Sequence, residues 1–314
     1  MKKPRERKTN VYKVNGKSLV AKTPFLNGDY LPEAVALTLN MLGGIEKSIK
    51  SGDHVMLKTN FNTQQPYPLS TELGFLAAVI EVLQDFGANV VVGEMCGRAS
   101  WPTEQVIAEL GVMPVLNRYG VEFVNFQYDD WIEVEVPGEY FKSYRVPRSI
   151  FEADKRVYAA NMRCHSSARY TASLKLGVGW LHEDDREILH AVREETEFKA
   201  AEVNLAFQPD IALIDGRRST VAWHGRGTYV FPNVIMASGD MVSLDTEAVK
   251  ILKSYPEENR IQGPLESIGQ ITHAQKLGLG SMDYVVREAE ANLETRQKSC
   301  IDPSAIPLTE EEKE

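Results

Sequence analysis

The sequence predicts an α/β protein built on a mostly parallel, Rossmann-like sheet with helices on both faces and a small antiparallel excursion. Two observations lead to this prediction. Several short runs are continuously apolar, as in strands that are buried on both faces of a sheet, and these runs alternate with helical patterns. The 314 residues are 43% hydrophobic and 25% charged, which suits one large α/β domain or two closely packed lobes.

The clearest unit lies between residues 55 and 93. Val55–Leu57 forms an apolar strand, and Ser70 or Thr71 can cap a helix whose leucine and isoleucine side chains fall on one face. Asn89–Gly93 then continues as a second apolar strand. Strand, helix and strand in this order predict a βαβ unit with a right-handed crossover.

The remaining elements continue the alternation. Residues 1–30 should form an arm or an edge segment, residues 31–300 the α/β domain, and residues 301–314 a disordered tail. We expect a helix from about Pro32 to Lys50, weakened at Gly43–Gly44, a hairpin within residues 131–147, and a solvated helix or lid-like connection over His182–Lys199. Further elements are expected at Lys17–Ala21, Thr103–Leu110, Val121–Asn125, Lys155–Ala160, Ile211–Ile214, Val234–Ala237 and, for the last helix, from between Asp240 and Asp245 to Tyr255-Pro256.

Composition excludes several classes of protein. A formal charge of −9 argues against general nucleic-acid binding, which needs a basic face. No run reaches the roughly 18 apolar residues of a membrane span, and the basic start lacks an apolar signal-peptide core, so we expect a cytoplasmic protein that binds no membrane. Cys96, Cys164 and Cys300 are far apart, which favours neither a disulfide scaffold nor an iron–sulfur cluster.

Polar side chains follow the apolar runs where each strand should end. Open α/β sheets bind ligands beyond the carboxyl ends of their strands, so these side chains are candidates for a binding site. They are Lys58, Asn60, Glu94, Asn161, Arg163, His165, Asp215, Arg217 and Asp240.

A small anionic ligand is the partner that these residues suggest, and association with a second copy of the chain stays open. The cationic side chains that could bind the anion are Lys58, Arg163, His165, Lys175 and Arg217. The alternative is that Lys58 and Arg217 pair with Glu94 or Asp215. Asn60 and Asn161 would contribute amide groups to the same site.

Several of these residues have both a catalytic and a structural interpretation. His165 could be a general acid or base, a metal ligand, or a structural histidine. Lys175 could bind an oxyanion or, if desolvated, act as a nucleophile. Asp245 could bind a ligand or cap its own helix, and Asp240, just after a strand, is better placed for function.

A divalent metal is a further option. Glu94, His165, Asp215 and Asp240 offer oxygen and nitrogen ligands that suit a hard or borderline divalent cation. No HExxH or comparable spacing supports a metal site. The cofactor therefore stays unknown.

Six segments carry a resemblance to a known family. These segments are VMLKTNFN (55–62), VVVGEM (90–95), YRVPRSIFEADKRVYAANMRCH (144–165), TASLKLGVG (171–179), PDIALIDG (209–216) and MASGDMVSLDTEAV (236–249). In their order and spacing, over roughly residues 50–255, the sequence resembles the domain-of-unknown-function 362 family.

The resemblance implies site residues but no generally assigned activity. The family pattern carries over as Lys58 and Asn60, then His165, Lys175, and the pair Asp240 and Asp245. Two family elements differ here: Lys-Thr-His is replaced by Arg163-Cys164-His165, and Lys-Asn by Lys175-Leu176. Many relatives carry a ferredoxin-like cysteine-rich module that this sequence lacks, and the family is distantly similar to nickel-pincer lactate racemase proteins.

Three hypotheses follow, and the sequence leaves open whether the protein is an enzyme. In the first, it is an enzyme of a small anionic molecule or cofactor precursor: Lys58, Arg163 and Lys175 hold the anion, His165 transfers protons, and Asp215 and Asp240 orient groups or bind a metal. In the second, it is a non-catalytic accessory protein that delivers an anion or a metal. In the third, it is a redox or racemase-type enzyme with an external cofactor, attached at Lys175.

Overall fold

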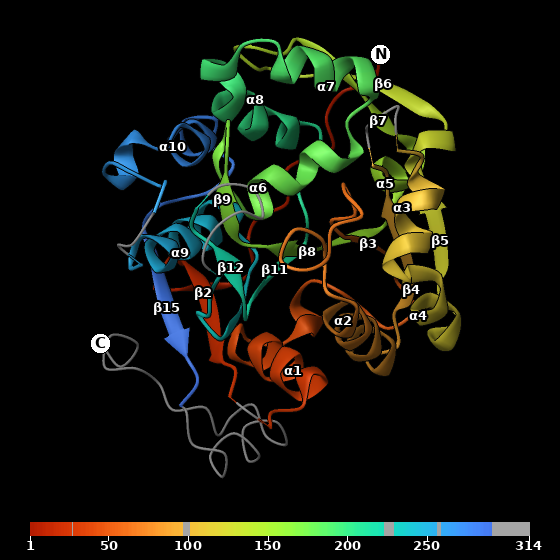
Figure 1. The fold of residues 1–314 in the computed structure, drawn as a ribbon, viewed down its shortest axis with the longest axis vertical. Coiled ribbons are helices and arrows are strands. Elements are labelled where there is room, and N and C mark those ends of the chain that lie inside the picture. Colours follow the sequence, from red (N-terminus) through yellow and green to blue (C-terminus); the bar gives the residue numbers. More distant parts are fainter. Residues whose placement is uncertain (27, 97–100, 223–228, 256–258, 291–314) are drawn as a thin grey trace.

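A nine-stranded sheet forms the centre of the protein (Figure 1). The computed structural model describes residues 1–26, 28–96, 101–222, 229–255 and 259–290. The strand order is β1-β2-β14-β11-β8-β3-β4-β5, and β15 also pairs with β2. These strands are β1 (Lys13–Val14), β2 (Lys17–Pro24), β3 (His54–Lys58), β4 (Asn89–Glu94), β5 (Glu122–Asn125), β8 (Lys155–Asn161), β11 (Ile211–Gly216), β14 (Val234–Ser238) and β15 (Tyr284–Glu288).

The sheet is mostly parallel, as the sequence predicted. Strands β5, β4, β3, β8 and β11 pair in parallel with one another, in this order, and make up what we call the parallel block. The strand β14 runs antiparallel to both β11 and β2. The edge of the sheet at which the strands of the parallel block finish is called the carboxyl end below, and the edge at which they start is called the amino end.

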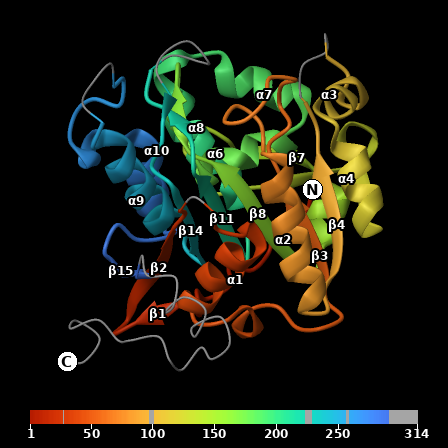
Figure 2. The same cartoon turned by 60° about the horizontal axis from the view of Figure 1, so that its bottom comes forward.

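Helices cover both faces of the sheet, which confirms the predicted fold class. Alternate residues of each central strand enter two separate cores: Val55 and Leu57 pack in one, and Met56 between them packs in the other. In Figure 2 the helices α1 (Leu31–Met41) and α2 (Leu73–Asp85) lie in front of the strands, over the first core. The second core holds α6 (Ser173–Leu176), α8 (Thr196–Glu202) and α9 (Met241–Lys253).

The predicted βαβ unit is confirmed as β3, α2 and β4. Val55 lies opposite Val90 in a parallel register. The helix begins one or two residues later than expected, because the Glu72 side chain accepts the backbone N–H of Phe75 at 2.8 Å and so acts as the N-cap in place of Ser70 or Thr71.

The helix expected up to Lys50 is shorter. It ends at Met41 as α1, since Gly43 and Gly44 adopt positive φ angles of 108° and 93° that an α-helix cannot contain. The expected hairpin is present as β6 (Trp131–Glu135) and β7 (Ser143–Pro147). The remaining elements are α3 (Thr103–Leu110), α4 (Val112–Tyr119), α5 (Arg148–Glu152), α10 (Gly269–Lys276), and the short strand pairs β9 (Arg163–His165) with β10 (Arg169–Thr171) and β12 (Ser219–Thr220) with β13 (Tyr229–Val230).

The charged stretch His182–Lys199 is less exposed than expected. It forms α7 (Glu183–His190) and the start of α8, and Arg186 and Lys199 are both buried. The expected tail of residues 301–314, Cys300 and the expected helix end at Pro256 lie outside the described residues. Within the described part of the chain, no helix is both long and apolar enough to cross a membrane.

The direction of β14 moves Asp240 away from the other candidate residues. Because β14 is antiparallel to β11, Ser238 pairs with Ala212 near the start of β11, and Asp240 lies at the amino end. Its carboxylate accepts the backbone N–H groups of Val242 and Ser243 at 2.9 and 3.0 Å and is the N-cap of α9. The expectation that Asp240 joins Lys58 and Asp215 at one end of the sheet is therefore wrong.

Replacement of Asp240 by alanine should destabilise the protein but leave the arrangement of the residues at the carboxyl end unchanged. The side chain also accepts the Ser18 hydroxyl and the Ser281 N–H, so we expect a loss of about 1–2 kcal/mol in the free energy of unfolding. Urea unfolding measures the change. The control is Asp283→Ala, which removes an acid that is 70% exposed and pairs with Lys17. This substitution should change the free energy of unfolding little. Equal effects of the two substitutions would contradict the capping role.

Candidate functional site

The carboxyl end gathers polar side chains from neighbouring strands. Lys58 ends β3, Glu94 ends β4, and Asn161 ends β8. Asp215, near the end of β11, is the direct partner of Asn161 in the sheet. These residues lie along one side of the sheet because their strands are parallel.

Lys58 and Glu94 form a fully buried ion pair. Lys58 Nζ lies 2.7 Å from Glu94 Oε2 and also donates to the Thr59 carbonyl at 2.6 Å. Burial lowers the pKa of Lys58 and raises the pKa of Glu94, so desolvation opposes the charged forms. Their mutual attraction, with the backbone N–H groups of Phe61 and Met95 donating to Glu94 at 3.0 and 2.9 Å, offsets that cost.

A glycine lies directly over this ion pair. A Cβ atom at Gly179 would come within 2.5 Å of Lys58 Nζ and 2.8 Å of Glu94 Oε1. The turn η3 (Gly177–Trp180) therefore packs so close to the ion pair that only a glycine fits at this position. This contact brings the segment around Lys175 to the ends of β3 and β4.

Three further cations lie near enough to this pair and to each other to interact electrostatically, and we call them the cation cluster: Arg163 of β9, Lys175 of α6 and Arg186 of α7. Within the described residues, Arg186 donates only to backbone carbonyls, those of Leu181, Cys96 and Met95. Arg163 donates to the Cys164 carbonyl at 3.2 Å, and its Nε is buried without a hydrogen-bond partner. Among the described residues, none of the three cations forms a salt bridge.

Lys175 is the most unusual member of the cation cluster. Its side chain is neither fully buried nor fully exposed, and within the described ranges its ammonium group has no hydrogen bond or ion pair. Desolvation, followed by the positive charges of Arg163 and Arg186, lowers the pKa of Lys175 to about 7. At neutral pH the amine is therefore about equally divided between its charged and neutral forms.

Asp245 fixes the helix that carries Lys175. From α9 its carboxylate accepts the N–H of Ser173 at 2.8 Å, the Ser173 hydroxyl at 2.5 Å and the N–H of Leu174 at 3.0 Å. The Tyr170 hydroxyl donates to the same carboxylate at 3.0 Å. Asp245 therefore caps α6 and not its own helix, where Asp240 is the cap. Burial raises the pKa of Asp245 to about 6.

Asp215 and Arg217 form the ion pair that was the alternative in the sequence interpretation. Arg217 Nη2 lies 2.8 Å from Asp215 Oδ2 and 2.8 Å from Glu72. The Tyr67 hydroxyl donates to Asp215 at 2.9 Å. These side-chain hydrogen bonds and charges outweigh burial and raise the pKa of Arg217. Asp215 is fully buried within this network, which leaves it poorly placed to act as a base.

Asn60 and Asn161 hold the loop that follows β3. Asn60 Nδ2 donates to the Leu69 carbonyl at 3.1 Å, and Asn161 Nδ2 donates to the Ser70 carbonyl at 3.2 Å. The two amides also contact each other at 3.5 Å. Their hydrogen bonds shape the backbone beside the Lys58–Glu94 pair.

His165 is the last residue of β9, opposite Arg169 of β10. Its Nδ1 accepts the backbone N–H groups of Ser167 and Ala168 at 3.3 and 3.2 Å, so the proton of the neutral ring sits on Nε2. The adjacent Cys164 thiol is buried, and burial raises its pKa. Both features suit a structural residue better than a proton-transfer pair.

The four candidate metal ligands are not brought together as one site. Glu94 pairs with Lys58, Asp215 pairs with Arg217, and Asp240 lies at the amino end. Over the described residues no group of three or more His, Cys, Asp or Glu side chains could hold a metal ion.

Arg186 is the functional candidate that the sequence interpretation missed. It lies in a run of acidic residues that is typical of a solvated face. The signal that could have found it is its spacing: Arg186 and the buried Leu189 are three residues apart and share the inner face of α7.

Comparisons with known proteins agree with the sequence resemblance. A family model described as "Domain of unknown function (DUF362)" matches residues 55–250. A thylakoid-associated protein of Synechocystis sp. is 23% identical over 246 residues, which cover 74% of this chain and 73% of that protein.

A solved structure, the lactate racemase apoprotein from Thermoanaerobacterium thermosaccharolyticum, superimposes with a TM-score of 0.35 and 12% identity. The match covers 80% of this chain and 62% of that one, so this chain spans less than two thirds of the racemase chain.

The buried ion pair gives a direct prediction. Glu94→Gln leaves the Lys58 ammonium buried without a counter-charge, and we expect a loss of about 3 kcal/mol in the free energy of unfolding, measured in urea. Lys58→Met combined with Glu94→Gln should recover part of that loss. Glu122→Gln on the exposed side of β5 is the matched control. A Glu94→Gln variant as stable as the control would contradict the ion-pair assignment.

Proposed function

The chain belongs to the domain-of-unknown-function (DUF362) family, and from that premise we propose that it is an enzyme that binds a small anionic molecule at the carboxyl end and exchanges a proton with it through Lys175. The anion would be a carboxylate or a phosphate group of the substrate, bound by the cation cluster. The Lys58–Glu94 pair would form the fixed floor of this site.

The observation that carries the proposal is that none of the three cations of the cation cluster forms a salt bridge among the described residues, although Arg163 and Arg186 are buried and only Arg186 interacts electrostatically with nearby acids, Glu94 and Glu183. Buried charges without a counter-charge cost several kcal/mol each, and like charges brought together add to that cost. Arg163 and Arg186 nevertheless keep their guanidinium groups near Lys175. A bound anion would offset the repulsion, which is the physical reason to infer a ligand here.

The division of roles follows from the chemistry of the side chains. Guanidinium groups present planar, fixed donors that match carboxylate and phosphate oxygens, so Arg163 and Arg186 would orient the anion. An amine with a pKa of about 7 both accepts and donates protons at neutral pH. It can also attack a carbonyl carbon. Lys175 would therefore perform the chemistry, and His165 and Asp215 would not.

An accessory role without turnover is the second candidate. It is favoured by one observation: His165 and Asp215, the acid–base residues expected from the sequence, are both occupied by structural hydrogen bonds. In that case the cation cluster would bind an anion, and Lys175 would contribute only positive charge to the cluster and take no part in a reaction. The reactivity of the Lys175 amine separates the two candidates.

Sulfate is a suitable probe of the anion site because its charge stays constant above pH 3. We expect calorimetric titration to detect sulfate binding that weakens as the pH rises above 7, by up to tenfold per pH unit, because deprotonation of Lys175 removes one positive charge. Lys175→Arg should keep the binding and lose this pH dependence.

The matched control for the loss of a lysine side chain is Lys199→Met. Lys199 is buried and pairs with Glu195 at 2.8 Å. Lys175→Met should weaken sulfate binding by at least about tenfold, whereas Lys199→Met should leave it unchanged. Equal binding by wild type and Lys175→Met would remove the basis of the proposal.

Chemical labelling tests the reactive amine. At pH 7 about half of Lys175 is neutral, compared with fewer than about one in 1,000 molecules of an ordinary lysine. Limiting acetic anhydride should therefore acetylate Lys175 before the exposed Lys50, as read by peptide mass mapping, and sulfate should protect it. Acetylation of Lys175 no faster than Lys50 would favour the accessory role.

A further inference from the structure

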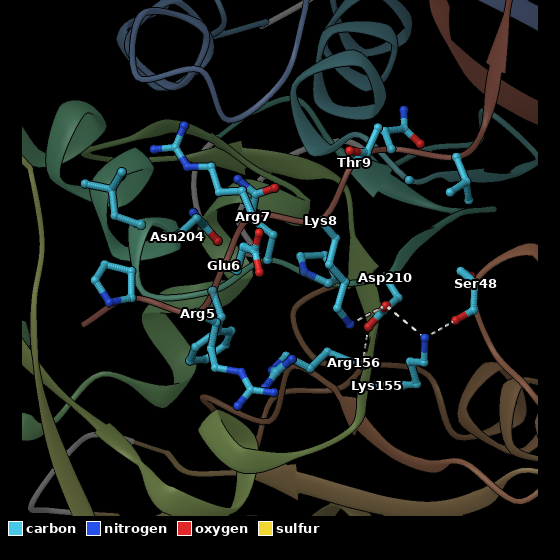
Figure 3. A pocket seen from close by; sticks show the side chains of 18 of the residues that line it. Arg5, Glu6, Arg7, Lys8, Thr9, Ser48, Lys155, Arg156, Asn204 and Asp210 are labelled. Atoms are coloured by element: carbon cyan, nitrogen blue, oxygen red, sulfur yellow. Dashed lines mark hydrogen bonds and ion pairs between the residues drawn. The ribbon is translucent and has the colours of Figure 1, made fainter. Parts of the chain in front are cut away.

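A cavity lies at the amino end, the opposite end of the sheet from the cation cluster. It has a volume of about 800 Å³ and is called the amino-end pocket here. Its walls are the N-terminal segment of residues 4–11, the start of β8, the segment that leads into β11 and part of the region around Ser48 (Figure 3). This volume lies within the range of small-molecule sites, about 300–1,000 Å³.

The lining of the amino-end pocket is strongly cationic, although the whole chain carries a formal charge of −9. Six cations and two acids, Glu6 and Asp210, give the lining a net charge of +4. Of the six cations, only Lys8 and Lys155 form salt bridges in the described structure, and both pair with Asp210. The six cations are Arg5, Arg7, Lys8, Lys47, Lys155 and Arg156.

Two guanidinium groups lie close together on one side of this pocket. In Figure 3 the side chain of Arg5 extends from the N-terminal segment toward Arg156 at the start of β8. Arg156 is buried, and its positive charge is not matched by a salt bridge in the described ranges, since its guanidinium donates to the carbonyls of Ile150, Phe151 and Ala153. Burial lowers the pKa of Arg156 to about 10; the negative charge of Asp210 opposes this shift, and the positive charge of Arg5 adds a smaller contribution to it.

The aromatic rings beneath these guanidinium groups hold them in place. Arg156 stacks 4.9 Å from the centre of the Phe207 ring, and Arg5 lies 5.9 Å from the centre of the Phe151 ring. The two like charges are therefore positioned before any ligand arrives. An anion between them would relieve their repulsion and find its donors already oriented.

A second group of donors lies around Asp210. Lys8 Nζ is 2.6 Å from Asp210 Oδ1, and Lys155 Nζ is 3.7 Å from the same oxygen. One carboxylate thus shares its charge between two ammonium groups. Lys155 Nζ also donates to the Ser48 carbonyl, and Lys8 Nζ also donates to the Asp154 carbonyl at 3.4 Å. Each ammonium has three donor positions, so each lysine keeps one of them for a ligand without leaving Asp210.

From this geometry we infer that the amino-end pocket binds a ligand with two or more linked phosphate groups, one at the Arg5–Arg156 pair and another at Lys8 and Lys155. A net charge of +4 exceeds what a single carboxylate would neutralise, and the two donor groups line one cavity. The ligand is either a free diphosphate compound or a lipid with a diphosphate headgroup, because both present the same oxygens.

Pyrophosphate is the probe, and the Lys175→Met protein is the background, so that binding at the cation cluster does not interfere. Calorimetric titration should show one pyrophosphate per chain. Arg5→Gln should weaken that binding by about tenfold, and Lys47→Gln should weaken it less. Arg118→Gln is the matched control, since Arg118 is an exposed arginine on α4 and has no salt bridge in the described structure.

Three outcomes decide the inference. Loss of binding in Arg5→Gln with retention in Arg118→Gln supports it. Equal affinities of these two variants, or no pyrophosphate binding to the background protein, would overturn it. Flotation with vesicles that contain diacylglycerol diphosphate identifies the source: vesicle binding that pyrophosphate displaces indicates a lipid headgroup in the pocket, and vesicle binding that pyrophosphate leaves unchanged counts against the pocket.

Discussion

Burial of the parallel block on both faces is the constraint from which the rest of the structure follows. Its strands contribute alternate side chains to two separate cores, so polar groups along their length would lose water without gaining partners. Polar and charged side chains are therefore displaced to the strand ends. At the carboxyl end this produces the Lys58–Glu94 pair, the Asp215–Arg217 pair and, beside them, the cation cluster.

The same constraint explains which features the sequence could predict. Apolar runs such as Val55–Leu57 identify a strand buried on two faces, and the charged residue after each run identifies its end. An apolar run does not indicate whether its strand will be parallel or antiparallel to the neighbouring strands. The run that ends before Asp240 looks like the others, but its strand, β14, is antiparallel to both of its neighbours, β2 and β11. The position of Asp240 at the amino end depends on that long-range pairing.

The candidate site was predicted in part for a related reason. The positions of Lys58, Asn60, Asn161, Arg163 and Lys175 at the carboxyl end follow from local patterns and parallel pairing. Local patterns do not predict which of these residues form ion pairs with acids, because such pairs depend on distances between segments far apart in the chain. Glu94 neutralises Lys58, whereas Arg163 and Lys175 lack such an acid among the described residues. Arg186 lies in an acidic stretch of the sequence. Its place in the cation cluster depends on the packing of α7 against the loop after β4.

The position of Lys175 rests on a residue in another helix. The helix α6 has only four residues, too few to be stable by its own hydrogen bonds. Its first N–H groups need acceptors, and Asp245 supplies both carboxylate oxygens. Desolvation disfavours the charged carboxylate, as its raised pKa shows, yet the donors from Tyr170, Ser173 and Leu174 favour it. The carboxylate of α9 thus offsets its own burial with the hydrogen bonds that hold Lys175 beside two arginines.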